Sequence, residues 1–175
     1  GELPILTQAE SNGDSLIDLG ATLYCGFYLN ELLLRLLHRH DPHEQLFALY
    51  GNALTRLGNG MAHEPVLRHF EKRLLDEIGY GLVLDRDVGD NSPLQAESLY
   101  DYRLDRGPLR LANPDLHTAV EGLRIRGRSL LALAHDTLDT DPVALREAKQ
   151  LMRMALDSHL GGRPLHTRTL FRSII

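Results

Sequence analysis

The sequence has 175 residues, of which 43% are hydrophobic and 25% are charged, with a formal net charge of −5 at pH 7. This length and composition suit one domain with a buried core and exclude a chain that is disordered overall. The mildly acidic balance excludes a protein that binds polyanions over its whole surface, and the single cysteine, Cys25, excludes an internal disulfide and a cysteine-cluster zinc site.

The first segment of the chain, residues 1–13, predicts a strand that is followed by a turn. The stretch GELPILTQA alternates loosely in polarity, and the Ser-Asn-Gly-Asp that follows is typical of a turn and a helix start. The sequence shows no secretory leader and no uncharged apolar run of about 18 residues, the length of a membrane span. We therefore expect a cytoplasmic protein that makes no membrane contact.

Three helices are predicted within a bundle that covers residues 14–84. The first, from Ser15 to about His38, is apolar over a wide arc, which indicates a central helix with neighbours on several sides. The second runs from about Pro42 to Leu57 and the third from His63 to Ile78, and each is followed by glycine, the residue that most often closes a helix.

Histidines gather between the first two helices, where His38, His40 and His43 lie next to Asp41. Imidazoles beside a carboxylate could ligate a metal ion, and a metal-dependent hydrolase is the enzyme class that they suggest. Cations also favour a helix C-terminus, and Asp41-Pro42 is a common helix start, so the pattern favours a helix boundary. No nucleotide loop, nucleophile elbow or zinc-protease motif is present, so we expect a binding protein with no cofactor and no metal.

Residues 85–126 predict a small β insert within the helical chain. Helical periodicity is weak there, and the stretch from Tyr100 to Leu111, YDYRLDRGPLRL, alternates on both sides of a Gly-Pro turn. We expect a short hairpin at this place and a weak helical turn near Asp115. The predicted fold is therefore mainly α, a helical bundle with a β-hairpin insert.

Residues 127–175 are predicted to complete the bundle with a short helix from Gly127 to Leu138 and a longer one that starts after Asp141. Asp141 is a plausible N-cap and Pro142 suits the first helical position, where no amide donor is needed. A double glycine at 161–162 ends this helix. Its apolar stripe consists of Leu145, Ala148, Met152, Ala155, Leu156 and His159.

Positive charge is concentrated at the C-terminal end of the sequence. Residues 142–175 hold six Lys or Arg and two acidic residues, a net charge of +4, whereas the other 141 residues have a net charge of −9. These cations either form weak surface ion pairs with the acidic remainder or hold an anionic partner. They are Arg146, Lys149, Arg153, Arg163, Arg168 and Arg172.

Three stretches resemble the RecO recombination mediators of bacterial DNA repair, and their order and spacing match as well. They are LYCGFYLNELL from Leu23, RHFEKRLLDEIGYG from Arg68 and AKQLMRMALDSHLGGRPLHTRTLF from Ala148. The resemblance implies a helical C-terminal domain behind an OB-fold barrel, of which residues 1–13 would be the last strand and linker, with most of the barrel absent from this chain. Some members bind zinc through four cysteines in the insert, and residues 85–126 contain none, so no zinc is expected.

The resemblance also implies a function, that of a non-enzymatic mediator associated with the bacterial nucleoid. Such proteins bind single- and double-stranded DNA, anneal complementary strands, work with RecR and help RecA load onto DNA coated with single-strand-binding protein (SSB). We expect the six basic residues of the C-terminal segment to contact DNA phosphates. The alternative is a helical adaptor that binds an acidic protein and makes no nucleic-acid contact.

A second site is expected for the tail of SSB, which is acidic and ends in an apolar residue with a free carboxylate. Its receptor needs cations beside a hydrophobic pocket. The helix from His63 to Ile78 carries a basic pair next to apolar residues, which suits the rim of such a pocket. The residues that we expect there are Arg68, Lys72, Arg73, Leu67 and Phe70.

Overall fold

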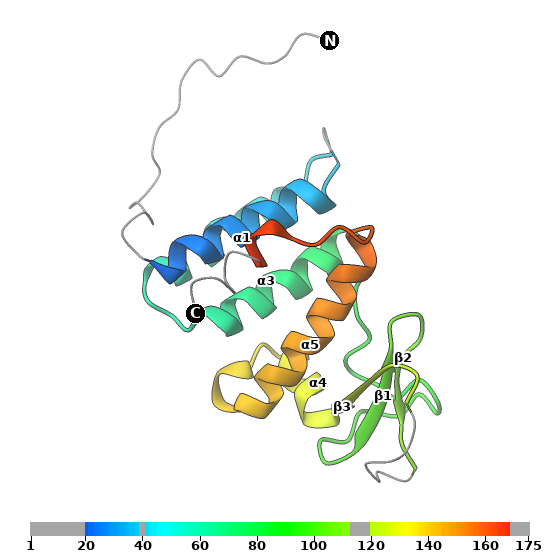
Figure 1. The fold of residues 1–175 in the computed structure, drawn as a ribbon. Coiled ribbons are helices and arrows are strands. Elements are labelled where there is room, and N and C mark those ends of the chain that lie inside the picture. Colours follow the sequence, from blue (N-terminus) through cyan, green and yellow to red (C-terminus); the bar gives the residue numbers. More distant parts are fainter. Residues whose placement is uncertain (1–19, 39–40, 113–119, 169–175) are drawn as a thin grey trace, which may run out of the picture.

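The structure is a computed structural model that describes residues 20–38, 41–112 and 120–168 (Figure 1). The strand and linker expected over residues 1–13, the turn near Asp115 and the expected DNA contact Arg172 lie outside these described residues. The elements, in chain order, are α1 (Ala21–Leu36), α2 (Glu44–Gly58), α3 (His63–Glu77), β1 (Leu99–Arg103), β2 (Gly107–Arg110), β3 (Leu123–Arg126), α4 (Gly127–Ala134), a 3-10 turn (Leu138–Thr140) and α5 (Pro142–His159).

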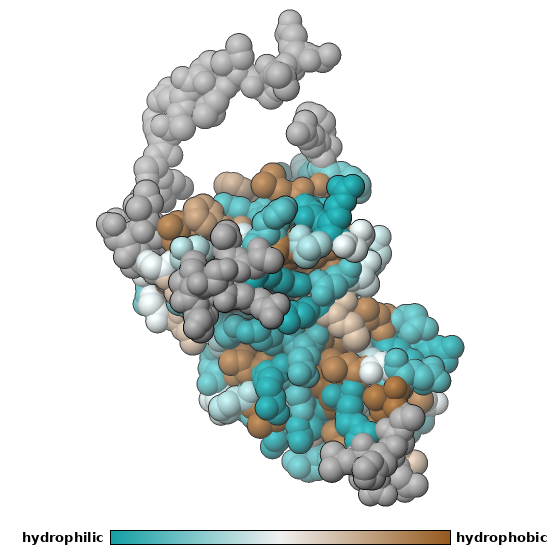
Figure 2. Space-filling model, viewed as in Figure 1, coloured by the Kyte–Doolittle hydropathy of each residue, from teal (hydrophilic) through white to brown (hydrophobic). Residues whose placement is uncertain are grey.

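The fold is mainly α, as the sequence predicted, with a small antiparallel sheet inserted between α3 and α4. Helices α1, α2, α3 and α5 pack together, and the sheet lies at the end of the molecule where α5 begins (Figure 1). The core is built from leucines, methionine and phenylalanine that recur at helical spacing, so each helix buries one stripe. Phe70 and Leu151, at the centre of α3 and α5, are fully buried. On the face of the molecule seen in Figure 1, hydrophilic residues are interspersed with smaller hydrophobic patches (Figure 2).

The start of α5 confirms the expected capping. The Asp141 carboxylate accepts hydrogen bonds from the backbone N–H of Val143 at 2.8 Å and of Ala144 at 3.1 Å, and Pro142 occupies the first turn. Of the expected apolar stripe, Ala148, Met152, Ala155 and Leu156 are buried, while Leu145 and His159 are half-buried.

The insert has one strand more than the hairpin that the sequence indicated. β1 and β2 form that hairpin, and β3 pairs antiparallel with the other edge of β1, so that the order is β2-β1-β3. β3 is only four residues long and lies far from the hairpin in sequence, too short for alternation to distinguish it. Ile125 of β3 pairs with Tyr100, and both side chains are buried.

One carboxylate joins this sheet to the helical body. Glu147 of α5 is buried and accepts hydrogen bonds from the Arg126 backbone N–H at 3.0 Å and the Ser129 hydroxyl at 2.6 Å. It also forms an ion pair with the guanidinium of Arg126. Glu147 therefore fixes the junction between β3 and α4 to α5, and an ion pair of 3.4 Å between Arg128 of α4 and the N-cap Asp141 adds a second polar link.

Helix α4 ends four residues before the predicted boundary at Leu138. Asp136 adopts a left-handed backbone conformation with φ of 58°, which stops the helix. The Lys72 ammonium of α3 donates to the carbonyl oxygens of Leu133 at 2.8 Å and Ala134 at 3.0 Å and to the Asp136 carboxylate at 2.5 Å. A side chain from a distant helix therefore satisfies the last turn of α4, which sequence spacing alone does not reveal.

Candidate functional site

A pocket of about 540 Å3 lies between α1, α3, α5 and the helical turn at residues 166–168. One wall is apolar or aromatic and consists of Ala21, Cys25, Tyr28 and Leu67. The rest of the lining holds four cationic side chains from three segments of the chain, which are Arg68, Lys149, Arg153 and Arg168, together with His63 and the carboxylates of Glu64 and Glu71. The pocket therefore offers positive charge beside a hydrophobic surface.

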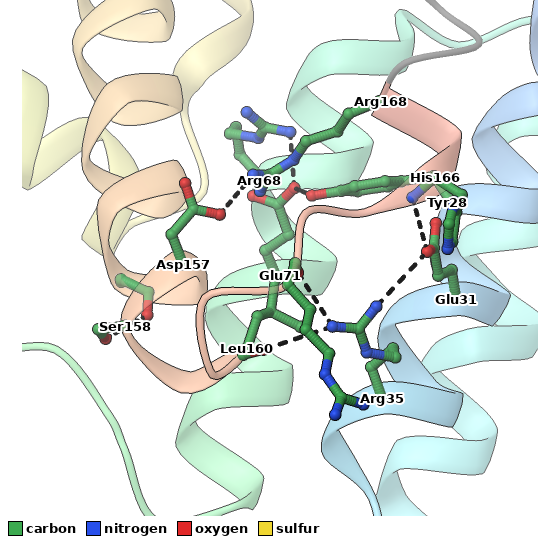
Figure 3. A network of polar contacts seen from close by, with 12 residues as sticks. Tyr28, Glu31, Arg35, Arg68, Glu71, Asp157, Ser158, Leu160, His166 and Arg168 are labelled. Carbon is green, nitrogen blue, oxygen red and sulfur yellow. Dashed lines mark hydrogen bonds and ion pairs between the residues drawn. The ribbon is translucent and has the colours of Figure 1, made fainter.

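The deep end of the pocket contains a buried polar network, shown in Figure 3. The fully buried carboxylate of Glu71 accepts a hydrogen bond from the Tyr28 hydroxyl at 2.5 Å and another from the Arg68 guanidinium at 2.6 Å. Burial raises the pKa of Glu71, while the charge of Arg68 and the hydrogen bond from Tyr28 act against this rise. Because Arg68 is also buried, the pair is held in a fixed geometry.

The outer rim carries ion pairs that are more exposed. Lys149 lies 2.6 Å from the Glu64 carboxylate, and Arg168 lies 2.5 Å from the Asp157 carboxylate. Arg153 is exposed on α5, and no carboxylate of the described residues lies within ion-pair distance of it. Burial, with a smaller contribution from Glu64, raises the pKa of the Cys25 thiol on the apolar wall to about 11, which favours the protonated thiol at neutral pH.

Arg168 reaches the pocket because the C-terminal segment turns back over α1. Gly161 and Gly162 allow the reversal, with φ of 62° and 71°, a region that residues with a β-carbon rarely adopt. The Arg35 guanidinium then donates to the carbonyl oxygens of Leu160 at 3.3 Å and Arg163 at 2.9 Å. Figure 3 shows these contacts between the loop and α1.

The Glu31 carboxylate holds the turn itself. It accepts hydrogen bonds from the backbone N–H of His166 at 2.8 Å and of Thr167 at 2.9 Å, and from the Thr167 hydroxyl at 2.7 Å. Desolvation pushes the pKa of Glu31 up, but the hydrogen bonds from Thr167 and His166 outweigh it and hold this pKa below its ordinary value. Glu31 and Arg35 therefore position Arg168 without lining the pocket themselves.

Acidification is expected to release this turn. A carboxyl group whose pKa is lowered on folding stabilises the fold above its unfolded pKa, and that contribution is lost as pH falls through its folded pKa. Protection of the Thr167 amide against hydrogen exchange, corrected for the intrinsic rate, should therefore fall roughly tenfold or more below about pH 4. Glu31→Gln should show weak protection already at pH 7, and Glu44→Gln on α2 is the matched control. Equal protection in Glu31→Gln and in the unaltered chain would contradict this assignment.

The structure brings two of the five residues expected at the SSB site to the pocket, Arg68 and Leu67. Phe70, by contrast, is fully buried in the core, and the ammonium of Lys72 is bound to the end of α4. Arg73 is half-exposed and lies 3.9 Å from Asp136, next to Lys72.

The six residues expected to contact DNA divide differently. Lys149, Arg153 and Arg168 line the pocket together with Arg68. Arg146 on α5 and Arg163 in the following loop are exposed, and neither has an ion-pair partner within the described part of the chain. Two groups that the sequence kept apart therefore meet in one pocket.

Sequence reasoning missed the carboxylates of the site. Glu71 follows Leu67 by four residues and precedes Leu74 by three, so it falls on the apolar stripe of α3. A charged residue on a buried stripe was a visible sign of a buried ion pair. No comparable sign marked Glu31 or Asp157, whose partners are far along the chain or beyond a turn.

The histidines between α1 and α2 form no metal site in the part of the chain that the structure describes. His43 lies 3.4 Å from Asp41 and 3.8 Å from Glu77, while His40 is outside the described residues. Across residues 20–38, 41–112 and 120–168, no three His, Cys, Asp or Glu side chains group closely enough to bind a metal ion. Nor is any helix in these ranges both long enough and apolar enough to cross a membrane.

Comparison with known proteins identifies the family. Residues 19–169 match the family model described as Recombination protein O C terminal. The chain is 45% identical to the DNA repair protein RecO of Nitrosococcus oceani, covering 99% of this chain and 69% of the relative. It is 50% identical to the protein of the same name from Alkalilimnicola ehrlichii, covering 99% and 67%, and 43% identical to that from Nitrosospira multiformis, covering 98% and 69%. The chain therefore belongs to the RecO family of DNA repair proteins and contains the family's C-terminal region.

Proposed function

We propose that the pocket binds an acidic peptide whose last residue is apolar and carries a free carboxylate, and that this peptide is the C-terminal tail of single-strand-binding protein. The observation that carries the proposal is the meeting of four cationic side chains with an apolar wall in one pocket. Guanidinium and ammonium groups bind carboxylates through charge-assisted hydrogen bonds, while an apolar wall accepts a hydrophobic side chain. The membership of a DNA repair family supports this partner.

We also propose that DNA phosphates contact the exposed cations outside the pocket. Arg146 and Arg163 support this, because the described part of the chain provides no carboxylate that would neutralise either one. On this proposal the protein is a non-enzymatic mediator that holds DNA and SSB together, anneals strands, works with RecR and helps RecA to load. The last three roles rest on the resemblance to RecO proteins.

Two sets of arginine variants should separate the two kinds of binding. Arg153→Gln should lower the affinity for a labelled Asp-Asp-Asp-Leu-Phe peptide roughly tenfold, the loss expected when one charge-assisted hydrogen bond is removed. Arg163→Gln removes the same charge outside the pocket and should leave peptide affinity unchanged. Against single-stranded DNA, Arg146→Gln and Arg163→Gln should each reduce the slope of log affinity against log salt by about one.

The measurements are fluorescence anisotropy at low salt for the peptide and a salt titration for the DNA. Equal loss of peptide affinity in Arg153→Gln and Arg163→Gln would mean that the whole charge of the chain, and not the pocket, attracts the peptide. Peptide binding without any DNA binding would favour the alternative of a helical adaptor.

A further inference from the structure

The cations of the pocket are already paired with carboxylates of the chain, with one exception. Arg68 pairs with Glu71 and also lies 3.7 Å from Glu64. Lys149 pairs with Glu64, and Arg168 pairs with Asp157. Arg153 has no such partner within the described residues. An acidic peptide that enters the pocket therefore meets one cation without a described carboxylate partner and three cations that are already paired.

The three pairs differ in how easily they can be broken. Arg68 and Glu71 are both buried, and Tyr28 adds a further hydrogen bond to the carboxylate. Breaking a buried pair leaves an uncompensated charge in the interior, which is strongly unfavourable. This pair is therefore a fixed part of the pocket and does not exchange.

In the two ion pairs at the rim, a ligand carboxylate can replace the carboxylate of the chain more easily. The side chains of Asp157 and Glu64 are 51% and 38% exposed, and those of their partners Arg168 and Lys149 are 20% and 46% exposed. Exposed ion pairs contribute little net free energy, because water solvates the separated groups well. A released Asp157 or Glu64 carboxylate would pass into water, and the incoming carboxylate would take over its cation.

We propose that Asp157 and Glu64 are intramolecular stand-ins for the acidic ligand, which displaces them from Arg168 and Lys149 after its first contact with Arg153. This inference rests on the peptide-binding function proposed above and adds its regulation: the chain lowers its own affinity. While the pocket is empty, these two carboxylates also neutralise the rim cations and so weaken their attraction for other anions.

The test removes each stand-in without changing its shape. Asp157→Asn and Glu64→Gln should each bind the Asp-Asp-Asp-Leu-Phe peptide roughly twofold to fivefold more tightly than the unaltered chain, the range set by one exposed ion pair. Both variants should also show a steeper fall of affinity with salt, because more ligand charge is then paired with cations. Asp105→Asn is the matched control, since it removes one carboxylate that pairs at 3.3 Å with Arg106 in the β1–β2 turn.

The possible outcomes separate this inference from the proposed function. If the unaltered chain binds the peptide and both variants bind it equally or more weakly, the two carboxylates position their cations and the exchange is refuted. The same conclusion follows if Asp105→Asn shows the same gain, because net charge then explains it. If neither the unaltered chain nor any variant binds the peptide, the proposed function fails and the exchange fails with it. Circular dichroism of each variant checks that the helices are intact.

Discussion

Arg68→Met is expected to lower the free energy of unfolding by about 3–5 kcal/mol near pH 7.5, because it leaves the buried Glu71 carboxylate without its cation. The loss should be smaller near pH 5. Burial raises the pKa of Glu71 and the charge of Arg68 opposes this rise, so the loss of Arg68 raises the pKa of Glu71 further. A carboxyl group with a raised folded pKa makes the free energy of unfolding fall as pH rises above the unfolded pKa. The variant should therefore lose more stability at pH 7.5 than at pH 5.

Denaturant unfolding of the variant at two pH values measures this effect. The double variant Arg68→Met/Glu71→Leu is the control, because replacing both members of a buried pair with apolar side chains is often close to neutral. The double variant should therefore recover most of the lost stability. If the single variant unfolds at the same denaturant concentration as the unaltered chain, the network does not stabilise the fold.

The same residue was expected from the sequence to bind a ligand, and the structure changes how that expectation should be tested. Arg68 lines the pocket, but it also neutralises Glu71 in the interior. A drop in peptide affinity after its removal could follow from altered packing alone. Arg153, which is exposed, lines the same pocket without a described ion-pair partner and so gives the cleaner measurement.

Lys72→Met is expected to lower the free energy of unfolding by about 2–3 kcal/mol and to leave peptide affinity unchanged. The substitution keeps the aliphatic stem but removes the ammonium that donates to Leu133, Ala134 and Asp136. One buried and two part-buried acceptors at the end of α4 then lose their charged donor, which is unfavourable above all for the buried Leu133 carbonyl.

Arg73→Gln is the matched control at the neighbouring position of α3. The Arg73 side chain is 52% exposed, and its distance of 3.9 Å from Asp136 is long for an ion pair. The expected change in the free energy of unfolding is therefore close to zero. Thermal or denaturant unfolding of both variants provides the comparison. A similar small effect for Lys72 and Arg73 would contradict the structural role of Lys72.

The helices could be predicted from the sequence because their signals are local. Apolar spacing on α3 and the Asp141-Pro142 start of α5 depend on residues within a few positions of one another, and both agree with the structure. The hairpin of β1 and β2 was visible for the same reason. β3 was not, because its pairing with β1 is long-range and its own stretch is four residues long.

The pocket could be predicted only in its parts. The sequence identified cations on the third helix and at the C-terminal end, but it assigned them to two different ligands. Their meeting depends on the turn-back after Gly161 and on Glu31, which binds Thr167 from 136 positions away. The functional difference between Arg68 and Lys72, four residues apart on one helix, depends on what packs opposite each, and that is a tertiary fact.

The contacts of Glu147 limit where this chain could be cut or joined to a related chain. The composition suggests that residues 85–126 are a separable module, but the last residue of β3 and the first turn of α4 both direct polar groups at this one carboxylate. Excising the module would strand a negative charge in the interior of the remaining helices. An exchange of inserts between relatives would therefore have to carry over Glu147 of α5 as well, so the segment to exchange runs from the insert through α4 into α5.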